Sequence, residues 1–274
     1  MATDYSQRYL ARLNRSPRLL LLKLLNQSFP VVETIRRIER KLAKPPNYRD
    51  IPACAITSSL EAGANHFHTH RWAFLENVFE SSFHQFLVSN WPRRRYFTAP
   101  FDMCKAYDKG FRWVERNPAP DHWGAVMARD AFAEDYPAYI DHHPHLRVLF
   151  DYLRSPAFIE RVIAFSGRPA RLRFNRFQLT MSYPGSSVAP HRDSQQDASS
   201  WVSFIFYISG TGGESSGGTA ILGDNEFEDV IFEPANLCNT CLAFDPAAPF
   251  YHGVRPMAFG KHRWMMSAEY VSDK

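Results

Sequence analysis

Cysteine is scarce in this sequence, which holds four among 274 residues. Four thiols scattered over positions 54, 104, 238 and 241 are too few for the disulfide framework of a small secreted domain. Cys238 and Cys241 have the spacing of a redox or half-zinc motif, but no second pair of cysteines accompanies them. We therefore predict two ordinary, partly buried thiols and a reducing, cytoplasmic setting.

Long hydrophobic runs are also missing. The most concentrated one near the start, Leu19–Leu25, is interrupted by Lys23 and is too short to cross a bilayer. No small-residue cleavage site follows it, as a secretory signal would require. The sequence therefore predicts neither export nor a membrane-spanning helix, and it contains no internal repeat or low-complexity segment.

A strong excess of one charge is absent as well, since the net charge is +4 and the pI about 8.9. The basic side chains concentrate near the N-terminus, at Arg8, Arg12, Arg15, Arg18, Arg36, Arg37, Arg40, Lys41 and Lys44. A basic helix can contact nucleic acid or an anionic membrane, but a solvated face is the simpler interpretation, and we predict no nucleic-acid partner. Hydrophobic residues make up 45% of the chain and aromatic residues 15%, which predicts a globular protein with a substantial core.

The first half of the chain has mainly helical patterns. We predict helices between residues 6 and 44, a loop to about Ala64 and a strand at His66–His70. Phe74–Phe79 is predicted as a strand that leads into a turn, followed by a helix that Ser81 and Ser82 cap and that ends before Trp91. Apolar residues recur at helical spacing over Leu146–Gly167. Within that stretch Ser155-Pro156 has the pattern of an N-cap followed by a first-turn proline, and Gly167 suits a C-cap, which predicts two helices.

The second half changes to short strands separated by Gly, Pro, Asn and Asp. The predicted strands are Arg171–Tyr183, Trp201–Ile208, Thr219–Leu222, Glu228–Phe232, Thr240–Phe244, Tyr251–Val254 and Trp264–Val271. Such a series is typical of a double-sheet jelly roll. We therefore predict an α+β fold, with a double-stranded β-helix (jelly roll) core at about residues 171–272 supported by N-terminal helices. Residues 1–64 would form a helical extension, and residues 65–274 the domain that contains the core.

Two clusters of histidine precede the strands. His66, His68 and His70 would share one face of a strand and could bind a metal, but no carboxylate or cysteine accompanies them at ligand spacing. A polar strand face is the better interpretation. The second cluster comprises His142, His143 and His145, which we interpret as a loop and helix cap.

A third group of candidate ligands lies in the strand region. His191 and Asp193 are two residues apart, so on a strand their side chains point to the same face and can bind one ion together. His252, from a distant predicted strand, would complete one face of an octahedron. Two histidines and one carboxylate form the ligand set of non-haem Fe(II) oxygenases. A His-x-Asp tripeptide alone is weak evidence, so the case depends on its surroundings.

The surrounding motifs resemble one family when they are taken in order. They are Tyr183-Pro-Gly, His191-x-Asp193, Phe206-Tyr207-Ile208, Gly217-Gly218-Thr219, Phe244-Asp245, His252-Gly-Val-Arg-Pro256 and Gly260-x-x-Arg263. From Leu172 to Val271 the chain is similar to the Fe(II)/2-oxoglutarate-dependent oxygenases, specifically their prolyl-hydroxylase-like branch. The resemblance implies a dioxygenase with bound Fe(II), with 2-oxoglutarate and O2 as co-substrates and with succinate and CO2 as co-products.

The resemblance also implies how the co-substrate is held. Arg263 would bind the C5 carboxylate of 2-oxoglutarate, because a planar guanidinium matches a carboxylate bidentately. Ser267 shares the strand face of Arg263 and would assist. The remaining pocket residues implied are the hydrogen-bonding phenols Tyr183 and Tyr207 and the pocket walls Leu179 and Ile205.

Asp193 bears on the type of reaction. In halogenating members of the superfamily a small residue replaces the carboxylate and leaves a position for chloride. The carboxylate is present here. We therefore expect hydroxylation, or a related desaturation, of an aliphatic C–H bond.

The substrate is addressed only by residues near the metal motif. Candidates for contact with it are Arg192, Gln195, Trp201 and Arg255, although each is also plausible as a solvated loop residue. We favour a small molecule, such as an amino acid, a metabolite or a biosynthetic intermediate. The alternatives are a peptidyl or prolyl hydroxylase that acts on a protein side chain and, less favoured, a jelly-roll binding protein without turnover.

Overall fold

The computed structural model describes residues 48–93, 128–129, 143–168, 171–182, 188–192, 200–211, 217–255, 257–258 and 261–272, together with residues 34, 35, 38, 39 and 42. These last five are helical, as predicted for that region. Most of the predicted N-terminal helices, His142, and the site candidates Tyr183, Asp193 and Gln195 lie outside the described residues. No helix in the described ranges is long and apolar enough to cross a membrane.

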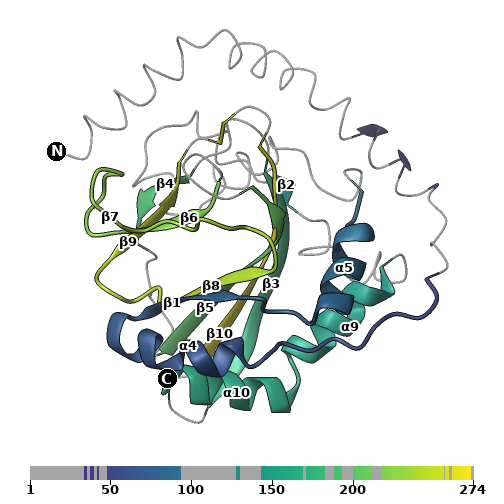
Figure 1. Ribbon diagram of the computed structural model, residues 1–274, viewed down its shortest axis with the longest axis horizontal. Helices are drawn as coiled ribbons and strands as arrows, with labels where there is room; N and C mark the ends of the chain where they lie inside the picture. Colours follow the sequence, from purple (N-terminus) through teal and green to yellow (C-terminus); the bar gives the residue numbers. More distant parts are fainter. Residues whose placement is uncertain are drawn as a thin grey trace, which may run out of the picture.

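The strands of the described chain form two antiparallel sheets (Figure 1). The larger sheet has the order β1-β8-β5-β10-β3-β2 and contains Trp72–Glu76 (β1), Thr240–Phe244 (β8), Ser200–Gly210 (β5), Arg263–Ser272 (β10), Leu172–Ser182 (β3) and Ala128–Arg129 (β2). The smaller sheet has the order β4-β9-β6-β7 and contains Val188–His191 (β4), Tyr251–Val254 (β9), Thr219–Leu222 (β6) and Val230–Phe232 (β7). From β3 to β10 the chain passes repeatedly between the sheets, which is the topology of a jelly roll. The predicted α+β fold with a double-stranded β-helix core is confirmed.

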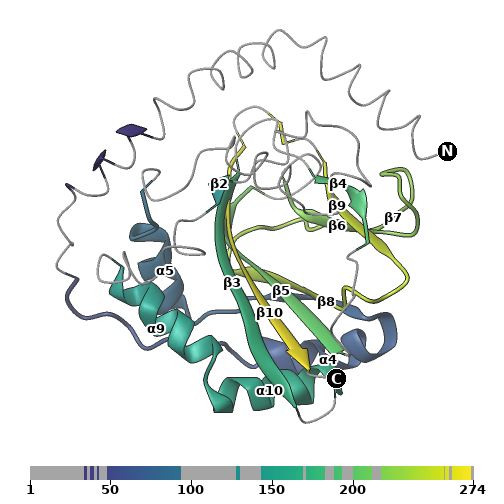
Figure 2. The same ribbon diagram turned by 180° about the vertical axis from the view of Figure 1, so that it is seen from behind.

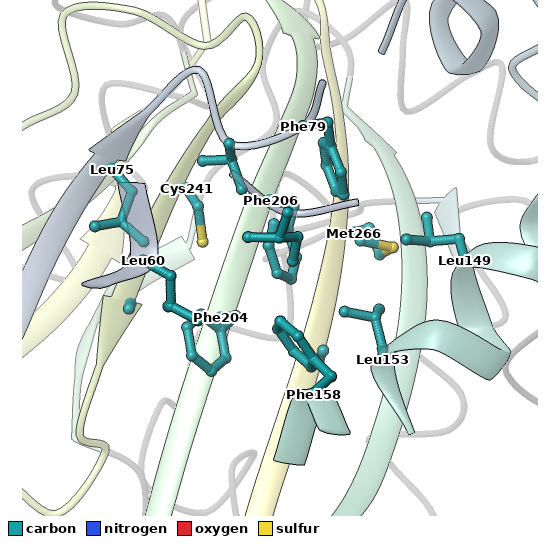
Figure 3. Packing of buried hydrophobic residues seen from close by; sticks show 14 of the residues in the cluster. Leu60, Leu75, Phe79, Leu149, Leu153, Phe158, Phe204, Phe206, Cys241 and Met266 are labelled. Atoms are coloured by element: carbon teal, nitrogen blue, oxygen red, sulfur yellow. The ribbon is translucent and has the colours of Figure 1, made fainter. Parts of the chain in front are cut away.

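Helices cover the outer face of the larger sheet (Figure 2). They are Ser59–His70 (α4), Ser81–Ser89 (α5), Pro144–Leu153 (α9) and Pro156–Ser166 (α10). Figure 3 shows the resulting core, in which Phe204, Phe206 and Met266 of the sheet pack with Leu149 and Phe158 of the helices. Because successive strand residues point to opposite faces, the other half of the same strands is left to face the smaller sheet.

The helix pair α9 and α10 follows the predicted local chemistry. Ser155 is the N-cap of α10, and its side-chain oxygen accepts a hydrogen bond from the Phe158 N–H at 3.2 Å. Pro156 occupies the first turn, where its missing N–H costs nothing. Gly167 ends the helix with a φ of 63°, a left-handed conformation that glycine adopts without strain.

The region from Ser59 to His70 differs from its prediction. It is helix α4, not a loop followed by a strand of alternating histidines. Leu60 and Phe67 anchor the helix in the core, and the ring of Phe67 lies 4.7 Å from that of Phe165. His66 and His70 are thus one helical turn apart, with ring centroids separated by 4.4 Å. The boundary expected between residues 64 and 65 falls inside this helix, and the division into an extension and a domain remains a prediction.

Two smaller expectations also need correction. Helix α5 has Glu80 at its N-cap position, without a side-chain capping bond, so Ser81 and Ser82 lie inside the helix and do not cap it. The two thiols of the Cys-x-x-Cys segment differ from each other, because Cys238 is exposed and Cys241 is fully buried in the core beneath the helices. No redox or zinc pair forms from them in the described residues.

Candidate functional site

Two histidines meet inside the barrel. His191 at the end of β4 and His252 in β9 are register partners in the smaller sheet. Directly opposite residues of an antiparallel pair share a face, and the two imidazole centroids lie 4.1 Å apart. His252 is 7% exposed, and its ring lies 4.8 Å from that of Phe244 on the larger sheet. The structure therefore brings together two of the three predicted metal ligands, from strands separated by 61 positions along the chain.

The third predicted ligand, Asp193, lies outside the described residues. Within the described ranges no group of three or more His, Cys, Asp or Glu side chains could hold a metal ion. This holds for the earlier histidine clusters too, since His66, His68 and His70 lie on α4, and His143 and His145 lie at the start of α9.

Arg263 begins β10 and is completely buried. Its Nε and Nη2 donate to Ser182 Oγ at 3.2 and 3.0 Å, and its Nη1 donates to the carbonyl oxygen of Gly217. Burial lowers the pKa of Arg263 to about 10, an effect that the nearby Tyr207 opposes. The guanidinium thus stays charged at neutral pH in a place without access to water.

The position beside this guanidinium, residue 217, requires glycine. Its φ is 89°, which a residue with a side chain adopts only under strain. A Cβ on Gly217 would also lie 2.6 Å from the sulfur of Met257. Gly217 therefore combines a left-handed backbone conformation with a backbone carbonyl that is presented to Arg263.

Tyr207 is the second fully buried polar group of the barrel. Its hydroxyl oxygen accepts a hydrogen bond from the Thr219 N–H at 2.8 Å, which links the larger sheet to the smaller one. Burial raises the pKa of Tyr207, and the neighbouring Arg263 opposes this rise, so the phenol keeps its proton at neutral pH. Since the oxygen acts as an acceptor towards Thr219, the proton remains to be donated to another group.

Ile205, predicted as a pocket wall, and Ser267, predicted to assist Arg263, both face the interior between the sheets. Ile205 lies in the apolar cluster between the sheets with Tyr207, Leu242 and Met265. Ser267 is half-buried and is the register partner of Ile205, so it faces the same interior.

The prediction that Leu179 lines the pocket is wrong, because Leu179 packs in the core on the helical side of the larger sheet. Its register partner is Met266, which belongs to the same core. The inward positions of β3 are instead taken by Thr180 and Ser182. Sequence reasoning missed these two hydroxyls, although the alternation of polar and apolar residues in Leu179-Thr-Met-Ser182 contains the signal.

Two of the substrate candidates are engaged in other contacts. The Arg192 guanidinium lies 4.3 Å over the ring of Tyr251, and its Nη2 donates to the carbonyl oxygen of Pro249 at 2.6 Å. Arg192 follows His191, the last residue of β4, and its partner Tyr251 precedes His252 on β9, so its side chain lies on the face opposite the histidine pair. The sequence could have indicated this, because the residue between His191 and Asp193 is expected on the opposite face from these two ligands.

Arg255 has a similar structural role. It donates to Glu233 at 3.1 Å and to the Phe227 carbonyl oxygen at 2.6 Å, and it lies 4.9 Å over the Phe227 ring. The contacts of both guanidinium groups thus involve residues other than the histidine pair. Trp201 lies in β5, but its side chain is not among those described.

No protein-family model matches the sequence, and no curated protein matches it either. Solved structures do show similarity. AviO1 from Streptomyces viridochromogenes is 16% identical, with a TM-score of 0.49, and the match covers 80% of this chain and 97% of AviO1. A prolyl-4-hydroxylase from Pseudomonas putida is 15% identical, with a TM-score of 0.39, and the match covers 82% of this chain and all of that one.

An oxidoreductase of the 2OG-Fe(II) oxygenase family from Burkholderia pseudomallei is 16% identical, with a TM-score of 0.37. That match covers 47% of this chain and 59% of the Burkholderia protein, so the chain spans less than two thirds of it. At these identities no residue role passes from these proteins to this chain.

Proposed function

We propose that this chain is a non-haem Fe(II)- and 2-oxoglutarate-dependent dioxygenase that hydroxylates an aliphatic C–H bond of a small molecule, with succinate and CO2 as co-products. One observation carries the proposal. A pair of imidazoles from neighbouring strands and a buried, charged guanidinium occupy the interior of the same barrel. The first suits a metal ion and the second suits a carboxylate, and this combination is what the proposed reaction requires.

The donor set fits ferrous iron. His191 and His252 would supply two nitrogen ligands, and Asp193, two residues after His191, would supply a carboxylate oxygen. Imidazole and carboxylate ligands on one face leave positions open for other molecules, which is the arrangement typical of non-haem Fe(II) oxygenases. A purely structural zinc site would instead be closed by four protein ligands.

The barrel interior also fits a keto acid. A carboxylate is an acceptor with two oxygens, and Arg263 and Tyr207 both present N–H or O–H donors in a buried place. Charge-assisted hydrogen bonds are stronger there than in water. A bound carboxylate would also offset the unfavourable burial of the Arg263 charge, which is visible in its lowered pKa.

When bound together, iron and 2-oxoglutarate supply the oxidising chemistry that activates O2 towards an unreactive C–H bond. The chain's own residues position the groups and exclude water. Arg263 and Tyr207 would fix the remote carboxylate of the keto acid, and Ile205 and Met265 line the interior beside them. No general acid or base from the chain is needed, so the metal ligands and the carboxylate-binding residues account for the site.

The closed seam between the two sheets supports a small-molecule substrate. Trp72 of edge strand β1 stacks on Phe232 of edge strand β7 at 4.7 Å, and Phe74 adds a contact with Phe232 at 5.1 Å. These three rings pack against the interior cluster and bridge the sheet edges. This closed edge leaves no groove for an extended peptide along that side of the barrel, and we therefore favour a small-molecule substrate.

The test is an anaerobic titration of the metal-free protein with Fe(II) and then with 2-oxoglutarate. We expect a weak visible charge-transfer band that appears only after both additions. The band should be lost in His191→Ala, His252→Ala and Asp193→Ala, and retained in His66→Ala, a matched control on α4. If iron binds but no band follows, the keto-acid role of Arg263 and the enzyme assignment are both wrong.

The second stage identifies the substrate class. Succinate release would be measured with panels of amino acids and other small metabolites, and separately with proline-containing peptides. Turnover with small molecules alone supports the proposal. Turnover with peptides alone would favour the peptidyl hydroxylase, and co-substrate binding without turnover would favour the binding protein.

A further inference from the structure

We propose that Thr180 is a third hydrogen-bond donor of the carboxylate pocket, so that its hydroxyl helps to bind the co-substrate alongside Arg263 and Tyr207. This inference rests on the proposed function. It adds a co-substrate-binding residue that is not part of the sequence motifs from which the resemblance was drawn.

The position of Thr180 follows from the register of the larger sheet. Its partner across β10 is Met265, which belongs to the apolar cluster between the two sheets. Two residues further along β3, on the same face, Ser182 receives the hydrogen bonds of Arg263. Side chains at i and i+2 of a strand are neighbours on one face. Thr180 therefore lies inside the barrel, one strand step from the residue that holds the guanidinium.

The hydroxyl of Thr180 is buried and has no hydrogen-bond partner among the described residues. The residue is 2% exposed, and no donor or acceptor of the described chain forms a hydrogen bond with its Oγ1. A buried polar group that lacks a partner is destabilising, whereas valine has the same shape without that cost. Threonine at this position is thus unfavourable for the ligand-free fold, which points to a partner that arrives with a ligand.

The neighbouring groups indicate what that partner is. Arg263 can only donate, Tyr207 already accepts from Thr219 and keeps a proton to donate, and the Thr180 hydroxyl can donate as well. Three donors on one interior surface select a ligand group that only accepts. A carboxylate is such a group, and the co-substrate is a dicarboxylate, so the end held by Arg263 would also be within the reach of Thr180.

The interior of the barrel contains a matched control. Thr240 lies on β8 as the register partner of Tyr207 and is equally buried. Its hydroxyl, unlike that of Thr180, already donates to the Asn236 carbonyl oxygen at 3.0 Å. Replacing Thr240 by valine removes a satisfied hydrogen bond and should lower stability, with little effect on co-substrate binding.

The experiment compares Thr180→Val, Thr180→Ser and Thr240→Val with the unmodified protein. Dissociation constants of 2-oxoglutarate would be measured by anaerobic calorimetry on the Fe(II)-loaded protein, and melting temperatures without ligand. We expect Thr180→Val to weaken 2-oxoglutarate about tenfold or more, as for a lost hydrogen bond to a charged group, with an unchanged Fe(II) affinity. Its ligand-free melting temperature should be equal or higher, and Thr180→Ser should bind like the unmodified protein.

Two results would overturn the inference. If Thr180→Val binds 2-oxoglutarate as tightly as the unmodified protein, the hydroxyl takes no part in binding. If it lowers the ligand-free melting temperature as Thr240→Val does and leaves affinity unchanged, its role is structural. Failure of the unmodified protein to bind 2-oxoglutarate is a separate outcome, which removes the proposed function and this inference together. Should Thr180→Val not fold, Thr180→Ala gives the same comparison with a smaller side chain.

Discussion

Arg263 combines two properties at the scale of a single residue. It is fully buried, and it binds Ser182 and Gly217 through several nitrogen atoms at once. We predict that Arg263→Lys keeps a positive charge but loses the planar fork that matches a carboxylate. The affinity for 2-oxoglutarate should fall at least about tenfold, and Arg263→Gln should lose more because the charge is gone as well.

The measurement for these variants is the anaerobic titration of Fe(II)-loaded protein with 2-oxoglutarate. The affinity for Fe(II) itself serves as the control and should be unchanged, since neither variant touches the histidine pair. Equal co-substrate affinities for Arg263→Lys and the unmodified protein would show that charge alone matters at this position.

His145 is a buried residue with a consequence for pH-dependent stability. It is fully buried at the start of α9, with the rings of Tyr48, Phe86 and His143 around it at 4.9, 5.6 and 5.8 Å. Burial lowers its pKa from 6.5 to about 4, and the Asn90 backbone opposes this shift. Between pH 6.5 and about 4 the unfolded chain therefore binds a proton that the folded chain refuses.

The free energy of unfolding should accordingly fall as the pH falls through this window, by up to roughly 3 kcal/mol from His145 alone. Above pH 6.5 this residue should contribute no pH dependence. Urea unfolding at pH 7, 6 and 5 would be compared for the unmodified protein and His145→Phe, which suits the aromatic surroundings. Parallel pH profiles for the two proteins would show that His145 is not the group responsible.

Strand β3 shows, at the scale of elements, what the sequence could and could not predict. Its extent was predicted within one residue at each end, because a long apolar and polar alternation lies between Pro and Gly. An irregularity inside the strand could not be predicted: the register shifts where Glu269 and Tyr270 of β10 pair with Arg176 and Phe174, so Asn175 is an extra residue. Such a bulge reverses the alternation on one side of it. Leu172 and Phe177 therefore face the same core although they are five positions apart, and Leu179, which was expected in the pocket, follows Phe177 on that core face.

Other elements differ in how strongly their local pattern determines them. β6, β8 and β9 have the predicted limits, since each is a short segment bounded by turn residues such as Gly, Asn, Asp and Pro. His252 lies on one of these predicted strands, whereas β4 was not among the predicted strands and His191 was identified from its His-x-Asp motif. Helix α4 was missed because His66, His68 and His70 imitate the period of a strand, while its two core anchors, Leu60 and Phe67, are sparse. Tertiary packing, and not the local sequence pattern, determines that this segment is helical.

Strand β10 and helix α9 are joined by one buried hydrogen bond. The hydroxyl of Tyr270, fully buried among the helices, donates to the carbonyl oxygen of Leu153 at 2.7 Å. Leu153 is the last residue of α9, where carbonyl groups lack partners within the helix. We predict that Tyr270→Phe lowers the free energy of unfolding by about 1–2 kcal/mol, measured by urea unfolding. Co-substrate affinity should be unchanged because Tyr270 faces away from the barrel, and a change in affinity without a loss of stability would contradict this.

The larger sheet serves two compartments at the scale of the whole molecule. In β5, Phe204 and Phe206 face the helices, and Ile205 and Tyr207 face the smaller sheet. This explains why the sequence from Trp201 to Ile208 is almost continuously apolar, as expected for a strand buried on both faces. The helical side supplies most of the apolar core, while the other side holds the polar groups of the proposed site. Stability and binding are therefore separable by mutation.

A single carboxylate connects the end of the sheet with two of the helices. Asp245 follows β8, and its side chain accepts hydrogen bonds from Arg71 at the C-cap of α4, from Arg168 after α10 and from the Ala247 N–H. Its side chain is 2% exposed, and those of Arg71 and Arg168 are 35% and 17% exposed. Removal of one partner from a buried ion pair leaves uncompensated charge. Here two like charges would remain side by side.

We predict that Asp245→Asn, which keeps the shape and removes the charge, lowers the free energy of unfolding by about 3 kcal/mol. Urea unfolding at pH 7 measures this, and the partial exposure of Arg71 keeps the loss at the lower end of the range for buried pairs. Asp151→Asn is the matched control, because Asp151 pairs with Arg147 at 2.9 Å on the exposed face of α9. Such a surface pair contributes less than about 1 kcal/mol. If both variants lose equally little, Asp245 does not hold the helices to the sheet, and the apolar core alone fixes their positions.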